Sequence, residues 1–239
     1  MTSPPMLLIL AVLMFVSYEV WGHGRLLEPP ARNMMWRFGY DVESNFEDTE
    51  LFCGGIVHQW KENVSGNCGE CGDAWELPRP REHETGGIYA GNITVRSFEP
   101  ESNIDIIIQL VANHMGWFQF SLCPRSSWEE WETNECFDNH ILELTDGSGT
   151  VLKVPTNDTG LIFTQVQLPK GLTCSHCVFR WHWMSGNNWG KCEDGIERPG
   201  CGPQETYRNC ADISILSGAG IRGPGINNPG SKIPGLSTP

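Results

Sequence analysis

The hydrophobic positions of this chain fall in short runs whose spacing is typical of β-strands. Clusters of Gly, Pro and Asn separate the runs, and no long stretch carries an apolar stripe of helical period between credible caps. Several short strands at this spacing favour an all-β protein, a β-sandwich, over a helical or α/β domain. The predicted strands are residues 88–95, 103–113, 117–122, 160–168, 177–184 and 212–216.

The strand predicted over residues 103–113 has the clearest alternation of apolar and other residues. Successive side chains of a strand point to opposite faces of its sheet, so residues of one parity share a face. We therefore expect one face of this strand to pack in the core. The residues of that parity are Ile104, Ile106, Ile108, Leu110 and Ala112.

Both ends of the chain differ in composition from its strand-rich middle. Residues 6–16 form an apolar run of signal-peptide length that is too short to span a bilayer. Val20 and Gly22 supply the small residues of a cleavage site, and the end of the chain is rich in Gly, Pro and Ser. The sequence thus predicts a signal peptide (1–22), one domain (23–216) and a flexible tail (217–239).

The segment from residue 32 to residue 80 has little periodicity and predicts long loops with a helical turn or two. All ten cysteines follow residue 22, and an even number in a secreted chain indicates disulfides whose pairing the sequence leaves open. The two C-x-x-C pairs lie too far apart for a zinc ribbon. The cysteines are Cys53, Cys68, Cys71, Cys123, Cys136, Cys174, Cys177, Cys192, Cys201 and Cys210.

The net charge and the glycosylation sequons limit which cellular compartments and which classes of partner fit this chain. The formal net charge of −13 argues against nucleic acid or an anionic membrane surface as a partner, because both require basic patches. Asn63, Asn92 and Asn157 begin N-x-Ser/Thr glycosylation sequons. No further apolar run has membrane length. We expect a secreted, extracellular and soluble protein.

Cleavage after Gly22 would leave His23 with a free α-amino group beside its imidazole. These two nitrogens can close a chelate ring on one metal ion, which a histidine inside a chain cannot do. His114 follows the strand 103–113, and Tyr207 precedes the last predicted strand. Each also has an ordinary interpretation: a solvated His23, a hydrogen-bonded His114 and a packed Tyr207.

Three segments resemble the lytic polysaccharide monooxygenases, in particular their animal and insect branch (auxiliary activity family fifteen type). They are HGRLLEPPAR at residues 23–32, VANH at residues 111–114 and YRNCADI at residues 207–213. The resemblance extends from residue 23 to about residue 216, and it implies an immunoglobulin- or fibronectin-III-like β-sandwich with disulfide-pinned loops.

The resemblance implies a single copper ion held by a histidine brace. The α-amino nitrogen and Nδ1 of His23 and Nε2 of His114 would be the ligands, with Tyr207 as a weak axial partner. Ala112 would leave the opposite axial side open. Copper stands at the top of the affinity order for nitrogen ligands, which agrees with this set. The side chains of Arg180 and His182 are candidates for tuning the site from behind the ligands.

The activity that the resemblance implies is oxidative cleavage of glycosidic bonds by a monomeric enzyme. An external electron donor would reduce the copper, which would react with O2 or H2O2. Chitin is the expected polymer and cellulose the alternative. A flat, aromatic surface would suit a crystalline substrate. The candidate aromatic contacts are Trp36, Tyr40, Trp117 and Trp189.

Two other function classes remain open from the sequence. The chain could bind copper or chitin without catalysis, in which case copper and a reductant would yield no oxidised oligosaccharides. It could also be a hydrolase that uses a carboxylate pair such as Glu129 and Glu130, or Asp146. A hydrolase would work with a chelator present and without a reductant.

Overall fold

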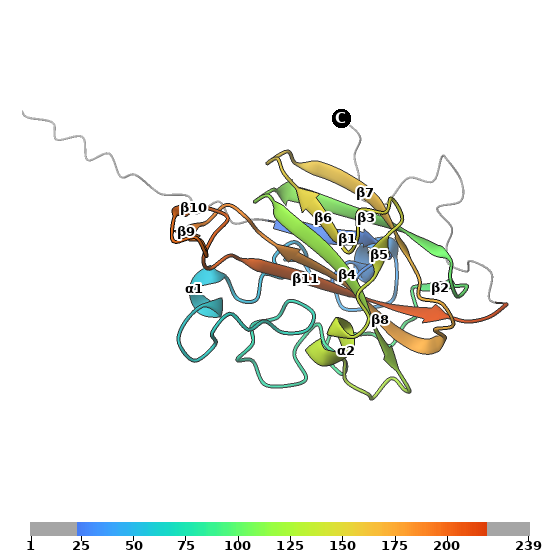
Figure 1. Cartoon of the computed structure of the whole chain (residues 1–239). Coiled ribbons are helices and arrows are strands. Elements are labelled where there is room, and N and C mark those ends of the chain that lie inside the picture. Colours follow the sequence, from blue (N-terminus) through green and yellow to red (C-terminus); the bar gives the residue numbers. More distant parts are fainter. Residues whose placement is uncertain (1–22, 219–239) are drawn as a thin grey trace, which may run out of the picture.

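The computed structural model describes residues 23–218. The predicted signal peptide and nearly all of the predicted tail, residues 1–22 and 219–239, lie outside the described residues. The described chain forms two β-sheets packed face to face, joined by long loops with a few short helices (Figure 1). The prediction of an all-β sandwich with disulfide-pinned loops is confirmed.

One sheet has the strand order β1–β3–β7–β5, the other has the order β2–β11–β8–β4–β6, and β9 and β10 form a separate hairpin. Within residues 23–218, no helix is long and apolar enough to cross a membrane. The strands are β1 (His23–Glu28), β2 (Arg96–Phe98), β3 (Asn103–Ala112), β4 (Gly116–Arg125), β5 (Glu143–Leu144), β6 (Val151–Val154), β7 (Gly160–Gln167), β8 (Cys174–Met184), β9 (Trp189–Lys191), β10 (Glu197–Pro199) and β11 (Thr206–Ile215). The helices are η1 (Met35–Phe38), α1 (Ile56–Gln59) and α2 (Asn134–Asp138).

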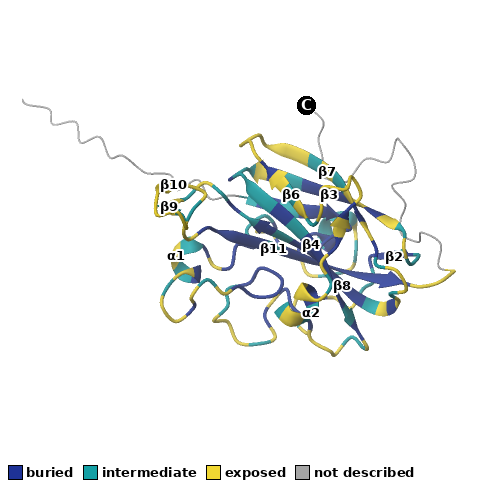
Figure 2. Cartoon of the chain, viewed as in Figure 1, coloured by how far each residue is buried: buried dark blue, intermediate teal, exposed yellow. Residues whose placement is uncertain are grey.

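The core lies between the two sheets and is built from buried residues of both. Figure 2 shows buried residues, in dark blue, along the central strands. The alternation expected in β3 is confirmed for its first four members, which are buried, while Ala112 is half-buried near the end of the strand. From the facing sheet, β4 and β8 contribute large aromatic side chains. The fully buried ones include Phe118, Phe120, Phe179, Trp181 and Trp183.

The strand predicted over residues 88–95 is wrong. Gly91 and Asn92 both adopt positive φ angles, of 55° and 48°, which breaks the extended backbone, and Ile88 is exposed. The chain joins a sheet only at its end, where the N–H of Val95 donates to the carbonyl of Asp212 before β2 begins. Ile93 and Val95 pack against the core from a loop instead.

The last strand begins six residues earlier than predicted, at Thr206. Its first half contains the polar residues Asn209 and Asp212, both buried, so it has no simple apolar alternation. Hydrogen bonds make this burial favourable: the Oδ1 of Asn209 accepts from the backbone N–H of Leu26 at 2.8 Å. Strands β1, β2, β5, β6, β9 and β10 were not predicted either.

All ten cysteines form disulfides, as predicted, which also removes the four-cysteine zinc site. Two bridges hold the long loops that follow β1, and one of them joins a loop to β11 across 139 residues of sequence. The pairs are Cys53–Cys68, Cys71–Cys210, Cys123–Cys136, Cys174–Cys177 and Cys192–Cys201.

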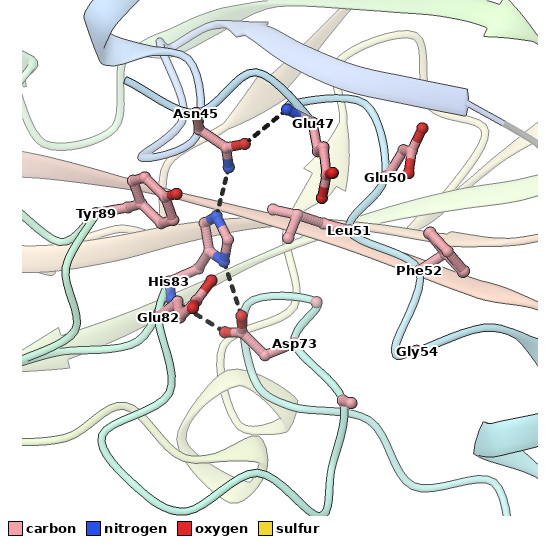
Figure 3. Close-up of a pocket in the computed structure, with 12 residues that line it drawn as sticks. Asn45, Glu47, Glu50, Leu51, Phe52, Gly54, Asp73, Glu82, His83 and Tyr89 are labelled. Atoms are coloured by element: carbon pink, nitrogen blue, oxygen red, sulfur yellow. Dashed lines mark hydrogen bonds and ion pairs between the residues drawn. The ribbon is translucent and has the colours of Figure 1, made fainter. Parts of the chain in front are cut away.

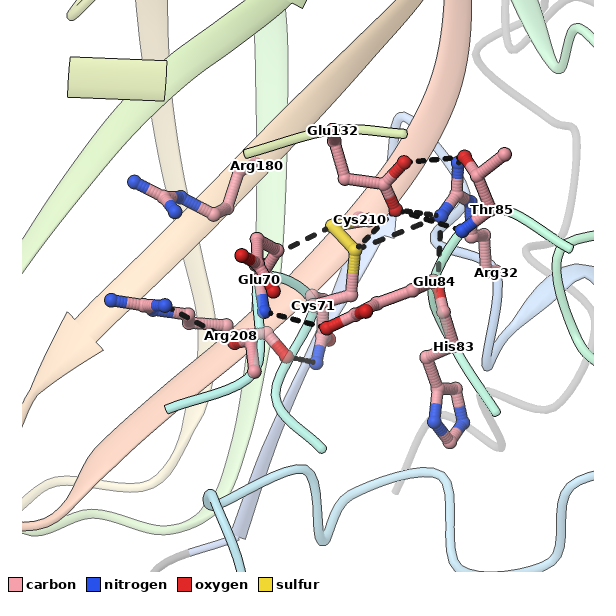
Figure 4. Close-up of a disulfide and its surroundings, with 12 residues drawn as sticks. Arg32, Glu70, Cys71, His83, Glu84, Thr85, Glu132, Arg180, Arg208 and Cys210 are labelled. Carbon is pink, nitrogen blue, oxygen red and sulfur yellow. Dashed lines mark hydrogen bonds and ion pairs between the residues drawn. A yellow bond between two sulfur atoms is a disulfide. The ribbon is translucent and has the colours of Figure 1, made fainter. Parts of the chain in front are cut away.

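A cluster of buried charges fastens the loops to β11 beside Cys71–Cys210 (Figure 4). The guanidinium of Arg32 binds both carboxylate oxygens of Asp212 at 2.7 Å and an oxygen of Glu132 at 2.7 Å. Burial by itself would raise the pKa of Glu132, but the charge of Arg32 and the hydroxyl of Thr85 lower this pKa to about 2. Glu132 is therefore ionised inside the protein.

Candidate metal centre

The pairing of β1 with β3 places His23 directly opposite Ala112, two residues before His114. Gly24 makes this approach possible because a Cβ there would lie 2.7 Å from the side chain of Leu110 and 3.0 Å from that of Trp181. The N–H of Gly24 donates to the carbonyl of Thr49, so a second segment lies along the start of β1. Two of the predicted ligands thus come to the same end of one sheet.

A tight turn from β3 to β4 presents His114. Met115 and Gly116 both have positive φ angles, of 56° and 92°, and a Cβ on Gly116 would lie 2.0 Å from the carbonyl oxygen of Met184. Only glycine fits this contact. The carbonyl of His114 also accepts a hydrogen bond from the N–H of Gly186 at 2.9 Å, which fixes the turn against β8.

The imidazole of His114 is oriented by a buried carboxylate. Its Nδ1 donates to Oε2 of Glu205 at 3.1 Å, and both residues are buried, with 7% and 6% of their surface exposed. Because Nδ1 is directed at Glu205, the other ring nitrogen, Nε2, faces away from that carboxylate. Metal-binding histidines in proteins are commonly held in this way by a carboxylate on the nitrogen that does not bind the metal.

Tyr207 reaches the same carboxylate from β11. Its hydroxyl donates to Oε2 of Glu205 at 3.1 Å, and its ring stacks on Trp183 of β8 at a centroid distance of 4.5 Å. Trp183 also lies 6.4 Å from the ring of His114. The structure therefore joins His114 and Tyr207 through Glu205, a residue that our sequence analysis missed. The only signal for it was its position two residues before Tyr207.

The imidazole of His23 is partly exposed, and its Nε2 lies 3.7 Å from a carboxylate oxygen of Glu50. An acid near Nε2 favours the tautomer that carries its proton there and leaves Nδ1 as the electron-pair donor. The nitrogens of His23 and His114, with the phenol of Tyr207, form a donor set suited to copper. The residues present therefore fit the metal that the resemblance implies.

The structure does not bring Arg180 and His182 to this site. In the register of β8 and β11, Tyr207 pairs with Trp183 and Arg208 pairs with His182, so the two candidates project from the opposite face of the sheet. Arg180 donates to Asn134 at 2.9 Å, and burial followed by the charge of Arg208 keeps the pKa of His182 well below its usual value.

The four aromatic candidates lie in different environments. Trp189 in β9 is 65% exposed. Its hairpin follows Gly186, whose N–H donates to the carbonyl of His114. Trp117 packs at 5.4 Å from the ring of His182, away from the core side of β4. Trp36 contacts an exposed Phe46, and the hydroxyl of Tyr40 donates to the carbonyl of Val95 near the start of β2.

A second group of metal-ligand residues, Asp73, Glu82 and His83, lines a cavity of about 260 Å³ (Figure 3). The oxygen of the Asn45 side chain accepts from the N–H of Glu47, so its nitrogen donates to Nε2 of His83 at 2.8 Å. The proton of His83 is then on Nδ1, which donates to Asp73 at 2.7 Å. Both ring nitrogens are engaged, and this histidine holds loops together.

The carboxylates considered for a hydrolase do not suit a general acid. Glu129, Glu130 and Asp146 are exposed, and hydrogen bonds from Ser127, Ser126 and Ser148, respectively, lower their pKa values. A catalytic acid near neutral pH requires the opposite shift.

Comparison with known proteins gives two matches. Residues 23–213 match the model of a family described as lytic polysaccharide mono-oxygenase, cellulose-degrading. The chain is also similar to a solved structure of an AA15 lytic polysaccharide monooxygenase from Thermobia domestica in the Cu(I) state. The two are 48% identical with a TM-score of 0.79, over 81% of this chain and 98% of the other. No curated protein matches the chain.

Proposed function

The chain belongs to the lytic polysaccharide mono-oxygenase family, and from this premise we propose which residues form its copper site and which polymer it cleaves. Its enzymatic class is that of a copper-dependent polysaccharide monooxygenase, which binds one copper ion and works extracellularly with an external electron donor and O2 or H2O2. The ligands, the polymer, secretion behind a signal peptide and action as a monomer are parts of the proposal.

In the proposed site, His23 contributes its α-amino nitrogen and Nδ1, and His114 contributes Nε2. The hydrogen bond from Nδ1 of His114 to Glu205 supports this assignment because it directs Nε2 away from the carboxylate. The α-amino group requires cleavage after residue 22, which lies outside the described residues. Its unperturbed pKa, roughly 7.7–8.0, allows a metal to displace its proton near neutral pH.

Tyr207, held by Glu205, would be a weak partner of the metal, and Ala112 would place no bulky side chain beside His23. The small side chain of Ala112 lies opposite His23 in the β1–β3 pairing, which supports this arrangement. The chemistry that copper supplies when bound is the activation of O2 or H2O2 after reduction by an external donor. One carboxylate oxygen of Glu205 accepts hydrogen bonds from both His114 and Tyr207 and so keeps both side chains in place.

The polymer is proposed to lie across exposed apolar side chains at this end of the sandwich. Val57 of α1 is 85% exposed and Trp189 of β9 is 65% exposed. The two elements are tied together: Nε1 of Trp60 donates to the carbonyl of Gln204, whose side chain accepts from the N–H of Asn188. A rigid apolar surface can stack against sugar rings of an insoluble chain.

We propose chitin as the substrate, with cellulose as the alternative outcome of the test. The test uses protein confirmed to begin at His23, loaded with copper, desalted and incubated with β-chitin or cellulose and ascorbate. Mass spectrometry of the soluble products should show oligosaccharides heavier by one oxygen atom from chitin, and none when EDTA is present.

Other results of the same test are equally decisive. Oxidised products from cellulose alone would replace chitin in the proposal. The absence of oxidised products from copper-loaded protein would favour copper binding or polymer binding without catalysis. Products without added oxygen that persist in EDTA would indicate a hydrolase.

A further inference from the structure

A short loop between β6 and β7 lies beside the turn that carries His114. The side-chain amide of Asn113 donates to the carbonyl of Thr156 at 3.0 Å and to that of Asp158 at 2.7 Å. Residues 155–159 therefore wrap around the amide of the residue that immediately precedes His114. The centre of this loop is Asn157.

The strand pairings place this loop at the same end of the sandwich as the proposed copper site. Val154, the last residue of β6, pairs with Gly116, and Gly160, the first residue of β7, pairs with Leu110. The loop thus starts and ends against the strands on either side of the His114 turn. Figure 1 shows it at the end of the molecule where β1 begins and the β9–β10 hairpin lies.

Asn157 begins the sequon Asn-Asp-Thr, and all three of its residues are exposed. The contacts that hold the loop involve the residues on either side of Asn157: the carbonyls of Thr156 and Asp158 accept from Asn113, and the Thr156 hydroxyl donates to the Asp158 carboxylate. The other two sequons differ: Asn63 donates its side-chain amide to Glu76 at 2.5 Å, and Asn92 sits at a backbone φ of 48°.

We propose that Asn157 carries an N-linked oligosaccharide at the rim of the copper face, where it restricts contact between that face and a flat crystalline polymer. The effect on polymer contact rests on the proposed function, while the modification itself does not. A glycan is bulky and hydrated, so beside a flat contact surface it holds the β6–β7 side of the protein away from the polymer.

The modification is an ordinary transfer from a lipid-linked oligosaccharide pyrophosphate in the secretory pathway. A bond forms between the Asn157 amide nitrogen and C1 of the first sugar, and the bond from C1 to the pyrophosphate oxygen breaks. The pyrophosphate lipid leaves with the electron pair, and the amide nitrogen loses one proton. No oxidant or reductant is required.

Asn92 provides a control because its loop joins β11 at a point away from Tyr207. Val95 donates to the carbonyl of Asp212, five residues beyond Tyr207 along β11, a distance of about 17 Å along the strand. A glycan on Asn92 is not expected to affect polymer contact at the copper face.

The first experiment measures occupancy of Asn157. The full chain is secreted from insect cells, treated with an amide-cleaving glycosidase in heavy-oxygen water and digested for mass spectrometry. We expect residue 157 to appear as labelled aspartate, because the glycosidase converts glycosylated asparagine to aspartate. An unmodified Asn157 in secreted protein would overturn the proposal.

The second experiment compares binding of copper-free wild type, Asn157→Gln and Asn92→Gln to crystalline β-chitin by sedimentation. Asn157→Gln should bind severalfold more tightly, and Asn92→Gln should match the wild type. Equal binding of all three proteins, with Asn157 glycosylated in the wild type, would show that the glycan does not restrict contact with the polymer. Because neither readout needs copper or turnover, a failure of this inference can be told apart from a failure of the proposed monooxygenase reaction.

Discussion

At the scale of single residues, the site depends on one buried carboxylate. Glu205 accepts hydrogen bonds from His114 and Tyr207 at the same oxygen, 3.1 Å from each donor. Its position two residues before Tyr207 was visible in the sequence, but its role requires the β3–β4 turn to approach the start of β11. The spacing of 91 residues between His114 and Glu205 offers no local signal.

Removing the proposed second histidine ligand should abolish tight copper binding. His114→Ala is expected to weaken copper affinity by more than the roughly 10–100-fold that loss of an outer partner causes. The fold should survive, since five disulfides and the core do not depend on this side chain. Isothermal titration with Cu(II) measures the affinity. His140→Ala is the control, because this histidine follows α2 and contacts the carbonyl of Cys136. Unchanged affinity in His114→Ala would exclude His114 as a ligand.

Removing the carboxylate behind His114 should have a smaller effect. Glu205→Ala is expected to weaken copper binding by about 10–100-fold because Nδ1 of His114 loses its oriented acceptor. Glu205→Gln, whose amide oxygen can still accept, should recover part of this loss. The Cu(II) electron paramagnetic resonance spectrum should change in Glu205→Ala. A spectrum and an affinity equal to those of the wild type would show that Glu205 has no positioning role.

At the scale of elements, alternation predicted strands only where one face is apolar. It located β3, β4 and β8, which present several buried apolar residues to the core. It also located β7, whose apolar residues are largely exposed apart from Val166 and the half-buried Ile162. It failed over most of β11, where polar side chains are buried with partners from β1 and from the loop that follows it. It also placed a strand over residues 88–95, where two positive φ angles exclude one.

The β3–β4 turn is expected to be the most sensitive local feature of the site. Gly116→Ala combines a positive φ with a Cβ placed 2.0 Å from a backbone oxygen, so it should lower the free energy of unfolding by more than about 2 kcal/mol. Gly147→Ala has a similar φ of 79° but no atom within 4 Å, and should cost only about 1 kcal/mol. Urea unfolding of the copper-free proteins measures both. Equal losses would mean that backbone conformation alone, without the close contact, sets the cost.

At the scale of the whole molecule, buried charges and disulfides, together with a small apolar cluster around Phe137, hold the loops to the sandwich. Arg32 binds Glu132 and Asp212, and the three residues come from distant segments of the sequence. Figure 4 shows Arg32 and Glu132 beside Cys71–Cys210. A buried ion group of this kind is destabilised strongly when one partner is neutralised. The free energy of unfolding should therefore fall at acid pH.

The pKa of Glu132 is lowered in the folded protein from 4.5 to about 2. A lowered carboxyl pKa adds stability that is complete above the unfolded pKa and is lost as pH falls through the folded pKa. We expect Glu132 to account for a loss of about 3 kcal/mol in the free energy of unfolding between pH 5 and pH 2. Urea unfolding across this range measures the slope.

Glu132→Gln is the informative variant for this prediction. It should be less stable than the wild type at pH 6, because Arg32 loses a charged partner, and its stability should vary less with pH between 5 and 2. Glu135→Gln, which alters an acid in the exposed first turn of α2, should keep the wild-type slope. A Glu132→Gln variant with the full wild-type slope would assign the acid sensitivity to other carboxylates.

The sequence by itself determined the β-sandwich, the disulfide content and the family resemblance, because alternation, cysteine number and short motifs are local properties of a chain. It also singled out His23, His114 and Tyr207. The tertiary structure decided the cysteine pairs, the role of Glu205 and the place of the Asn157 loop. These depend on which distant segments meet, and strand pairing and buried hydrogen bonds fix that only once the chain has folded.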